Sequence, residues 1–192
     1  MNTSARPAPA TPPHLGGHRY VTHVDGGVLE YLRVHLPVRT LLDVGCGPGG
    51  MVQLAVGQGI DAIGIDGDPV ILRVTPVKDR TRLVIHDFST GPAPVAGEFD
   101  LAWSVEFLEH VAAEHAVHYL PAFQQAKHVF CTAAPPGTGG FHHVNCQPEE
   151  YWIEFFEQGG FRYCPELTRQ LKTVSTMKRE FVQRSGMFFR RR

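Results

Sequence analysis

Long apolar runs are missing from this 192-residue sequence. No stretch approaches the roughly 20 consecutive apolar residues that a membrane helix needs, so we expect no membrane span. Cysteine is scarce as well: the four residues, at positions 46, 131, 146 and 164, include no pair with CxxC spacing. The N-terminus lacks a cationic and apolar leader pattern. These absences argue against a disulfide framework or a zinc knuckle and predict a cytoplasmic protein.

A charge excess of one sign is also missing, because the formal net charge is -1. This value excludes a globally basic nucleic-acid binder. The last 31 residues, 162–192, do hold nine Lys/Arg against two Asp/Glu, but they contain no recognised nucleic-acid motif and no ladder of aromatic residues. A small-molecule partner is therefore favoured over a nucleic acid.

Hydrophobic residues make up 43% of the chain, which is enough for one buried core. Residues 1–17 differ from the rest, with four prolines, two glycines and few large apolar residues. We predict a flexible tail over residues 1–17 and a single domain over residues 18–192. Removing such a tail should leave the melting temperature nearly unchanged.

Apolar bursts alternate with segments long enough for helices. Short strands alternating with helices are typical of a mostly parallel sheet that is covered on both faces, so the expected fold class is α/β. Helices are expected over residues 20–36, 50–59, 148–158 and 166–179, with room for more between 66 and 82 and between 106 and 126. The predicted strands are 40–46, 61–66, 82–88, 99–104, 127–133, 161–164 and 184–191.

A glycine-rich turn, DVGCGPGG (43–50), follows the first predicted strand and opens a helix. Glycines allow a sharp turn and a close approach of the backbone to a ligand. The letters fit the dinucleotide pattern GxGxxG, but Asp43 directly before the glycines would repel a pyrophosphate. A carboxylate there suits a ligand with an amino or sulfonium cation, which disfavours an NAD-dependent oxidoreductase.

Two later strands end in acidic residues that suit a nucleoside. Asp66 can accept hydrogen bonds from both hydroxyls of a ribose, a property shared with NAD enzymes. Asp87 can bind an adenine amino group, and Phe88 can stack on the ring.

These segments resemble successive motifs of the class I S-adenosylmethionine-dependent methyltransferases: DVGCGPGG, GID (64–66), HDF (86–88) and FDLAWSVEFLEHV (99–111). Their order and spacing are also similar over roughly residues 20–190. The resemblance implies a Rossmann-like sandwich with seven strands, mostly parallel, and an antiparallel last strand. It implies S-adenosylmethionine as the cofactor. The expected cofactor-binding residues are Asp43, Gly45, Cys46, Gly47, Gly49, Asp66, Gly67, Asp87, Phe88 and Ser104.

Glu106, Glu109 and His110 form a Glu-x-x-Glu-His element after the fourth strand. On a helix this spacing places them on one face, where they can hold a divalent metal. The element resembles that of small-RNA 2′-O-methyltransferases and of the O-methyltransferases of ubiquinone synthesis. His142 or His143, in the loop after the fifth strand, is a further candidate ligand. Without metal, one of these two histidines can act as the general base, and the Glu-x-x-Glu-His residues then have structural or cofactor-side roles.

The predicted function is methyl transfer to an oxygen of a small molecule, sugar or metabolite. No Asn-Pro-Pro-Tyr motif, typical of base or amide methylation, follows the fourth strand, where the sequence reads Ser-Val-Glu-Phe. Two alternatives remain: a module that binds S-adenosylmethionine without catalysis, and metal-dependent 2′-O-methylation of RNA.

Overall fold

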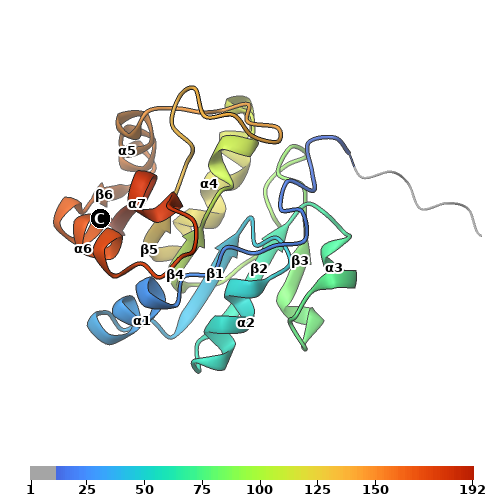
Figure 1. The fold of residues 1–192 in the computed structure, drawn as a ribbon, viewed down its shortest axis with the longest axis horizontal. Coiled ribbons are helices and arrows are strands. Elements are labelled where there is room, and N and C mark those ends of the chain that lie inside the picture. Colours follow the sequence, from blue (N-terminus) through green and yellow to red (C-terminus); the bar gives the residue numbers. More distant parts are fainter. Residues whose placement is uncertain (1–11) are drawn as a thin grey trace, which may run out of the picture.

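The computed structural model describes residues 12–192; residues 1–11 lie outside this description. One seven-stranded sheet runs through the molecule (Figure 1). Its strands are β1 (Thr40–Val44), β2 (Asp61–Asp66), β3 (Leu83–Ile85), β4 (Phe99–Ser104), β5 (Ala126–Cys131), β6 (Phe161–Tyr163) and β7 (Met187–Arg191). They lie in the order β3-β2-β1-β4-β5-β7-β6. β1 to β5 pair in parallel and β7 is antiparallel to both of its neighbours, which confirms the predicted α/β sheet with an antiparallel last strand.

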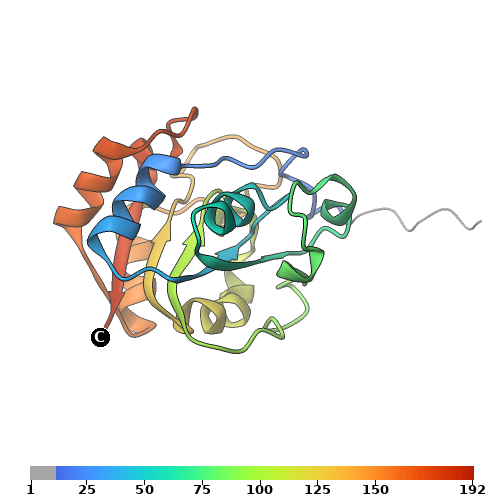
Figure 2. The ribbon, with the colours of Figure 1, turned by 90° about the horizontal axis from the view of Figure 1, so that it is seen from below.

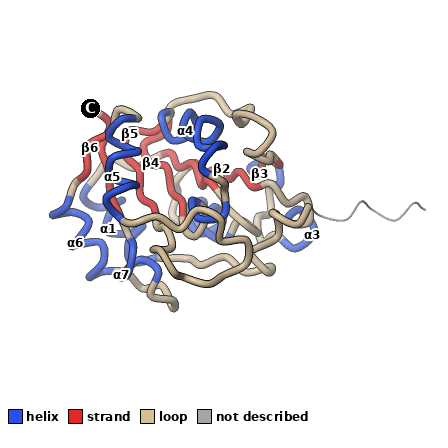
Figure 3. Tube along the Cα trace, turned by 90° about the horizontal axis from the view of Figure 1, so that it is seen from above, coloured by secondary structure: helices blue, strands red, loops and turns tan. Residues whose placement is uncertain are grey.

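Helices cover both faces of this sheet. α1, α2, α3, α6 and α7 pack on one face, and α4 and α5 pack on the other. Figure 2 shows α1 and α6 side by side, and in Figure 3 the strands run between α4 and α6. The helices are α1 (Gly26–His35), α2 (Gly50–Gly57), α3 (Ile71–Val74), α4 (Ala116–Gln124), α5 (Glu149–Gln158), α6 (Pro165–Val174) and α7 (Phe181–Ser185). Single 3₁₀ turns cover Arg80–Arg82, Leu108–His110 and Ala113–His115.

The central strands are buried on both sides, as expected for a parallel sheet between two helical layers. All six residues of β4 are buried. Successive side chains of a strand point to opposite faces, so Leu41 packs against α1 and α2 while Leu42 packs against the α4 and α5 layer. This continuous burial explains why the strands appear in the sequence as apolar bursts.

The N-terminal helix is shorter than predicted: it begins at Gly26 and not at Tyr20. Arg19 and Tyr20 have φ angles of 45° and 63°, which no α-helix contains. Asp25 has extended backbone and its side chain accepts a hydrogen bond from the Val28 amide, so it is the N-cap. Residues 21–25 therefore cross the molecule as an irregular segment.

Asp25 also explains why the predicted helix 166–179 ends at Val174. Its carboxylate accepts hydrogen bonds from the Ser175 hydroxyl and from the Thr176 amide, the latter at 3.0 Å. These bonds hold the chain in a turn, and α7 then occupies the start of the predicted strand 184–191, so that β7 begins only at Met187.

The predicted tail differs from the structure over residues 12–17. His14 Nε2 lies 2.7 Å from Asp87 Oδ2, and a Cβ atom added to Gly67 would lie only 2.5 Å from Leu15 Cδ2. His18 Nε2 continues this contact, 3.2 Å from Asp68 Oδ2. We call residues 14–22 the N-terminal strap. The rest of the predicted tail, residues 1–11, lies outside the described residues.

Within the described residues, no helix is both long and apolar enough to cross a membrane. All four cysteines lie in this part of the chain, and each is a free thiol.

Candidate active site

A cavity of about 800 Å³ opens at the carboxyl ends of the parallel strands. Its walls are the loops that follow β1 to β5, and the N-terminal strap crosses it. Open α/β sheets bind their ligands at this edge, next to the point where the strand order reverses. Here that point lies between β1 and β4, since β2 and β3 lie on one side of β1 and β4 and β5 on the other.

The glycine-rich turn forms the floor of the cavity beneath β1. The amides of Gly45 and Cys46 both donate to the carbonyl of Ile65, each at 2.9 Å, which ties the turn to β2. Gly45 has φ 77°, and an added Cβ would lie 2.5 Å from the Phe107 ring. Only glycine fits at this position, because both the backbone conformation and the ring exclude a side chain.

Asp43 is buried at the end of β1 and lines the cavity. Its Oδ2 atom has no hydrogen-bond partner among residues 12–192. Burial, reinforced by the nearby Asp66 carboxylate, raises the pKa of Asp43 well above its usual range. A buried carboxylate without a donor fits a ligand that brings a cationic group, so this residue suits the amino or sulfonium cation of the expected cofactor.

Asp66 lies at the end of β2, across the turn from Asp43. Its two oxygens accept hydrogen bonds from the Gly47 amide at 2.8 Å and from the Asp68 amide at 2.9 Å. Burial raises its pKa despite these bonds. The carboxylate thus fixes the glycine turn and also lines the cavity beside Gly67, where a ribose is expected.

Asp87 and Phe88 follow β3, which ends earlier than predicted, at Ile85. Both residues line the cavity. Burial raises the pKa of Asp87, but hydrogen bonds from His14 and Ser89 outweigh it, and the net pKa is lowered. The Phe88 ring packs edge-on against Phe107, with centroids 5.6 Å apart, and is largely covered by its neighbours.

Two expected cofactor contacts lie elsewhere in the structure. The Ser104 hydroxyl donates to the Val44 carbonyl at 2.9 Å, which links β4 to β1, and the residue does not line the cavity. Gly49 is the N-cap of α2 and lies outside the cavity wall too. The contact with the cofactor that the resemblance implies for Ser104 and Gly49 therefore stays a prediction.

Glu106, Glu109 and His110 do not share a helix face, contrary to the prediction. Glu106 turns sharply after β4, with φ 56°, and Glu109 and His110 lie in a 3₁₀ turn. The turn nevertheless brings the carboxylates together: the neighbouring Glu106 adds to the effect of burial and raises the pKa of Glu109 well above its usual range. Both oxygens of Glu109 are buried and have no hydrogen-bond partner in the described chain.

His143 completes a group of potential metal ligands with Glu109 and His110. Their ligand atoms all lie within 4.8 Å of one another. Atoms bound about 2.1 Å from one ion lie at most about 4.2 Å apart, so small side-chain movements suffice. Burial, with His143 nearby, lowers the pKa of His110 to about 4, and a neutral imidazole is the form that binds metal. The unpartnered carboxylate of Glu109 and the neutral imidazole of His110, with His143 beside them, fit a divalent cation.

The two predicted catalytic histidines have different surroundings. His143 Nδ1 lies 3.0 Å from the Thr138 carbonyl, so Nδ1 carries the proton and Nε2 is left with a free lone pair. His142 has φ 48° and its ring lies 6.1 Å from that of His14 in the strap. Both histidines line the cavity. Of the two, His143 is the one that belongs to the group of potential metal ligands with Glu109 and His110 in the described chain.

Sequence reasoning missed two residues that position this group. The Thr132 hydroxyl accepts the Glu106 amide at 3.0 Å and lies 3.3 Å from its carboxylate. Asn145 is buried: its amide donates to the Glu109 carbonyl at 3.0 Å and its side chain donates to the Val111 carbonyl at 3.1 Å. Both follow β5, and no local pattern marks them, because their partners are more than 25 residues away in the sequence.

A family model described as a methyltransferase domain matches residues 18–144. No match to a curated protein sequence was found. Among solved structures, the sugar N-methyltransferase KedS8 from Streptoalloteichus sp ATCC 53650 has a TM-score of 0.64 at 16% identity, covering 86% of this chain and 85% of that one. A TehB-like SAM-dependent methyltransferase from Corynebacterium glutamicum ATCC 13032 has a TM-score of 0.59 at 19% identity, covering 86% and 88%. The magnesium protoporphyrin IX methyltransferase from Synechocystis PCC 6803, solved with bound SAM, has a TM-score of 0.59 at 15% identity, covering 84% and 74%.

Proposed function

Since the chain belongs to the methyltransferase-domain family and is an S-adenosylmethionine-dependent enzyme, we propose that it methylates a hydroxyl oxygen with the help of a divalent cation. The acceptor is a small molecule, sugar or metabolite. One observation carries this proposal: the buried Glu109 carboxylate has no hydrogen-bond donor among residues 12–192 and lies beside two imidazoles that can bind metal. The similar structures do not decide the acceptor atom, since one is a sugar N-methyltransferase and another acts on a porphyrin.

The cofactor would lie along the carboxyl ends of β1, β2 and β3. S-adenosylmethionine supplies an electrophilic methyl group on a sulfonium. Asp43 would hold the amino group or the sulfonium at its unpartnered oxygen, and Asp66 would accept the ribose hydroxyls. Asp87 would accept the adenine amino group after His14 releases it, while the turn at Gly45 and Gly47 lets the ligand approach the backbone.

The acceptor would bind over the loops that follow β4 and β5. Glu106, Glu109, His110 and His143 would hold the cation, which lowers the pKa of a coordinated hydroxyl and orients it. Thr132 and Asn145 keep these ligands in place through the bonds described above. His142, which lines the same cavity, would take up the proton that the hydroxyl releases.

Binding of Mn²⁺, followed by electron paramagnetic resonance, tests the metal part of the proposal. The protein saturated with S-adenosylhomocysteine should bind about one Mn²⁺. Glu109→Gln should weaken this binding at least tenfold, because a charged ligand is lost, and should leave the affinity for S-adenosylhomocysteine unchanged. Glu154→Gln, on the exposed face of α5, is the matched control. Equal Mn²⁺ binding by both variants would remove the metal from the proposal.

The acceptor is sought with a labelled methyl donor and fractionated metabolites, polysaccharides and RNA. Labelling of a small hydroxyl compound that stops in excess chelator and returns with Mg²⁺ or Mn²⁺ supports the proposal. Labelling of RNA alone would favour the 2′-O-methyltransferase alternative. Full activity in excess chelator would leave a lone histidine as the base, and substitution of His142 or His143 should then reduce the rate by roughly 10²–10⁴.

A further inference from the structure

The cavity has a positively charged end that the proposed methyl transfer does not use. In the described part of the chain, two side chains with a permanent positive charge line the cavity, Arg19 and Arg179. Arg19 also lines a smaller neighbouring cavity with Asp68, so its charge lies close to a carboxylate. Arg179 comes from the turn between α6 and α7, far from that region in the sequence. The carboxylates that line the main cavity are Asp43, Asp66, Asp87 and Glu106.

The Arg179 guanidinium has no carboxylate partner within residues 12–192. The arginines on the adjacent helices behave differently: Arg169 pairs with Glu166, and Arg184 pairs with Glu180 at 3.3 Å. A guanidinium offers several N–H groups in one plane, which match the oxygens of a carboxylate or phosphate. Arg179 is therefore the arginine of this region whose donors remain available to a ligand.

His23 provides a second donor beside Arg179. Its ring packs edge-on against Phe181, with centroids 4.9 Å apart, and all three residues line the cavity. Burial and the nearby Arg179 charge lower the pKa of His23. This shift favours the neutral imidazole, which can donate one hydrogen bond without adding charge.

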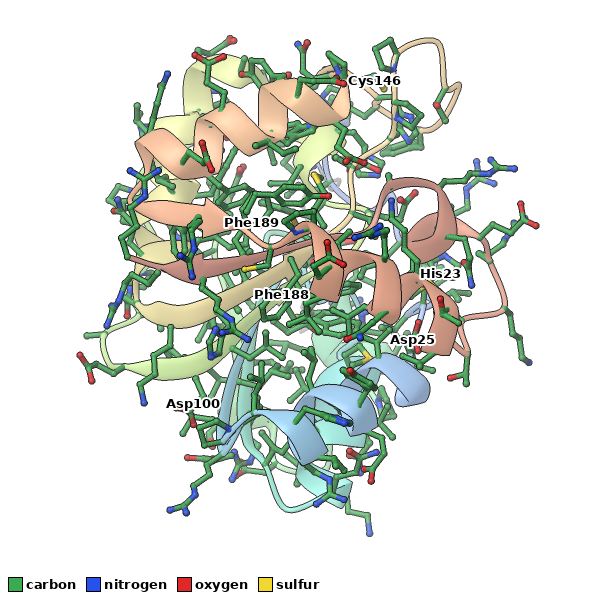
Figure 4. The ribbon with its side chains drawn as sticks, turned by 90° about the vertical axis from the view of Figure 1, so that its left-hand side faces the viewer. His23, Asp25, Asp100, Cys146, Phe188 and Phe189 are labelled. Atoms are coloured by element: carbon green, nitrogen blue, oxygen red, sulfur yellow. The ribbon has the colours of Figure 1, made fainter. Side chains whose placement is uncertain are left out.

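The Asp25 carboxylate joins the two chain segments that carry these donors. Asp25 is fully buried and accepts the amides of Val28 and Thr176, each at 3.0 Å, together with the Ser175 hydroxyl. Thr176 in turn accepts the Gly27 amide at 2.9 Å. Figure 4 shows His23 and Asp25 where the N-terminal segment meets the C-terminal helices. The segment that carries His23 and the turn that carries Arg179 are thus joined by buried hydrogen bonds.

We propose that Arg179 and His23 form a subsite for a carboxylate or phosphate group at this end of the cavity. Arg179 supplies the charge and His23 a neutral hydrogen bond. The anionic group belongs either to the cofactor, as its amino-acid carboxylate, or to the acceptor molecule. The statement that the anion comes from the cofactor or from the acceptor rests on the proposed function. The existence of the anion subsite does not.

Calorimetry on the full chain tests the subsite with Arg179→Gln and Arg179→Lys. Arg184→Gln, on α7 but outside the cavity wall, is the matched control. The probes are S-adenosylhomocysteine, its decarboxylated analogue S-adenosyl-3-thiopropylamine, and inorganic phosphate added to the protein with and without S-adenosylhomocysteine. We expect Arg179→Gln to weaken one anionic probe at least tenfold, and Arg179→Lys to retain part of the affinity.

The pattern of losses identifies the source of the anion. Loss of S-adenosylhomocysteine affinity with an unchanged decarboxylated analogue assigns the subsite to the cofactor carboxylate. If Arg179→Gln binds S-adenosylhomocysteine and its decarboxylated analogue as the wild type does but loses phosphate binding, the subsite belongs to an anionic acceptor. If Arg179→Gln behaves like Arg184→Gln with every probe, the subsite does not exist. A wild-type protein that binds phosphate through Arg179 but no nucleoside would refute the proposed function and leave the subsite intact.

Discussion

Asp43→Asn should stabilise the cofactor-free protein and weaken cofactor binding. The carboxylate lies 2% exposed at the end of β1, and its Oδ2 atom has no hydrogen-bond partner in the described chain. An unpartnered buried polar group costs about 1–3 kcal/mol of folding free energy. Asn is neutral but still polar, so we expect a gain of about 1–2 kcal/mol at pH 7.5. For a domain of this size the gain corresponds to a rise in melting temperature of about 2–8 °C.

The pH dependence of this gain follows from the raised pKa of Asp43. Below the unfolded-state pKa of about 3.9 the carboxyl group is protonated in both states, and the wild-type protein carries no penalty. As the pH rises, the unfolded chain releases its proton first, and the folded state is progressively destabilised relative to it. The difference between Asp43→Asn and the wild type should therefore be small near pH 4 and largest at pH 7 to 8.

Asp100→Asn is the matched control, because Asp100, labelled in Figure 4, is also a buried aspartate of the sheet. Unlike Asp43, it has a partner for each of its carboxylate oxygens. Its Oδ2 accepts the amides of Arg39 and Thr40 at 2.8 and 3.1 Å, and Lys127 lies 2.8 Å from Oδ1. Burial raises its pKa, but these partners outweigh burial and lower it. Asp100→Asn should accordingly destabilise the protein at neutral pH, and this loss should shrink as the pH falls through the folded-state pKa.

Scanning calorimetry across pH 4 to 8 measures both stabilities, and titration calorimetry measures binding. Loss of a charged hydrogen bond of about 1.5–3 kcal/mol should weaken S-adenosylmethionine binding by Asp43→Asn by about 10- to 150-fold. A variant that is less stable than the wild type at pH 7.5, or that binds the cofactor with wild-type affinity, would refute the reasoning.

Three further changes test other contacts. Asp66→Asn should weaken S-adenosylhomocysteine binding by about 1–3 kcal/mol in titration calorimetry, while NAD should bind neither the variant nor the wild type; unchanged affinity would place the ribose elsewhere. Deletion of residues 1–17 removes the contact of His14 with Asp87. It should therefore lower the melting temperature by about 2–4 °C and speed cofactor release in stopped-flow fluorescence. If both quantities stay unchanged, residues 12–17 do not stabilise the fold, as the composition predicted. Thr132→Val leaves the Glu106 amide without its acceptor. It should lower the free energy of unfolding by about 1–3 kcal/mol and weaken Mn²⁺ binding. A free energy of unfolding equal to that of the wild type, measured with denaturant, would contradict this role of Thr132.

The sequence by itself determined the sheet and the part of the cavity wall that lies at the ends of β1 and β2. Strands buried on both faces must be apolar along their length, so their order appears in the sequence as alternating bursts. The glycine turn is equally local, because the φ of 77° at Gly45 favours glycine whatever the rest of the chain does. Asp43 and Asp66 end neighbouring parallel strands, and such ends always meet at one edge of a sheet.

Only the tertiary structure decided which polar groups are satisfied. The Ser104 hydroxyl donates to the Val44 carbonyl, whereas the Glu109 carboxylate, which is equally buried, has no donor in the part of the chain that the structure describes. Asp25 caps α1 and also binds Ser175, 150 residues away, at the point where α6 ends. No periodicity in the sequence reveals this link. Whether a buried polar group has a hydrogen-bond partner depends on residues that folding brings together. Periodicity and backbone conformation are properties of residues that are neighbours in the sequence. For this reason the strands and the glycine turn could be predicted, whereas the hydrogen-bond partners required the structure.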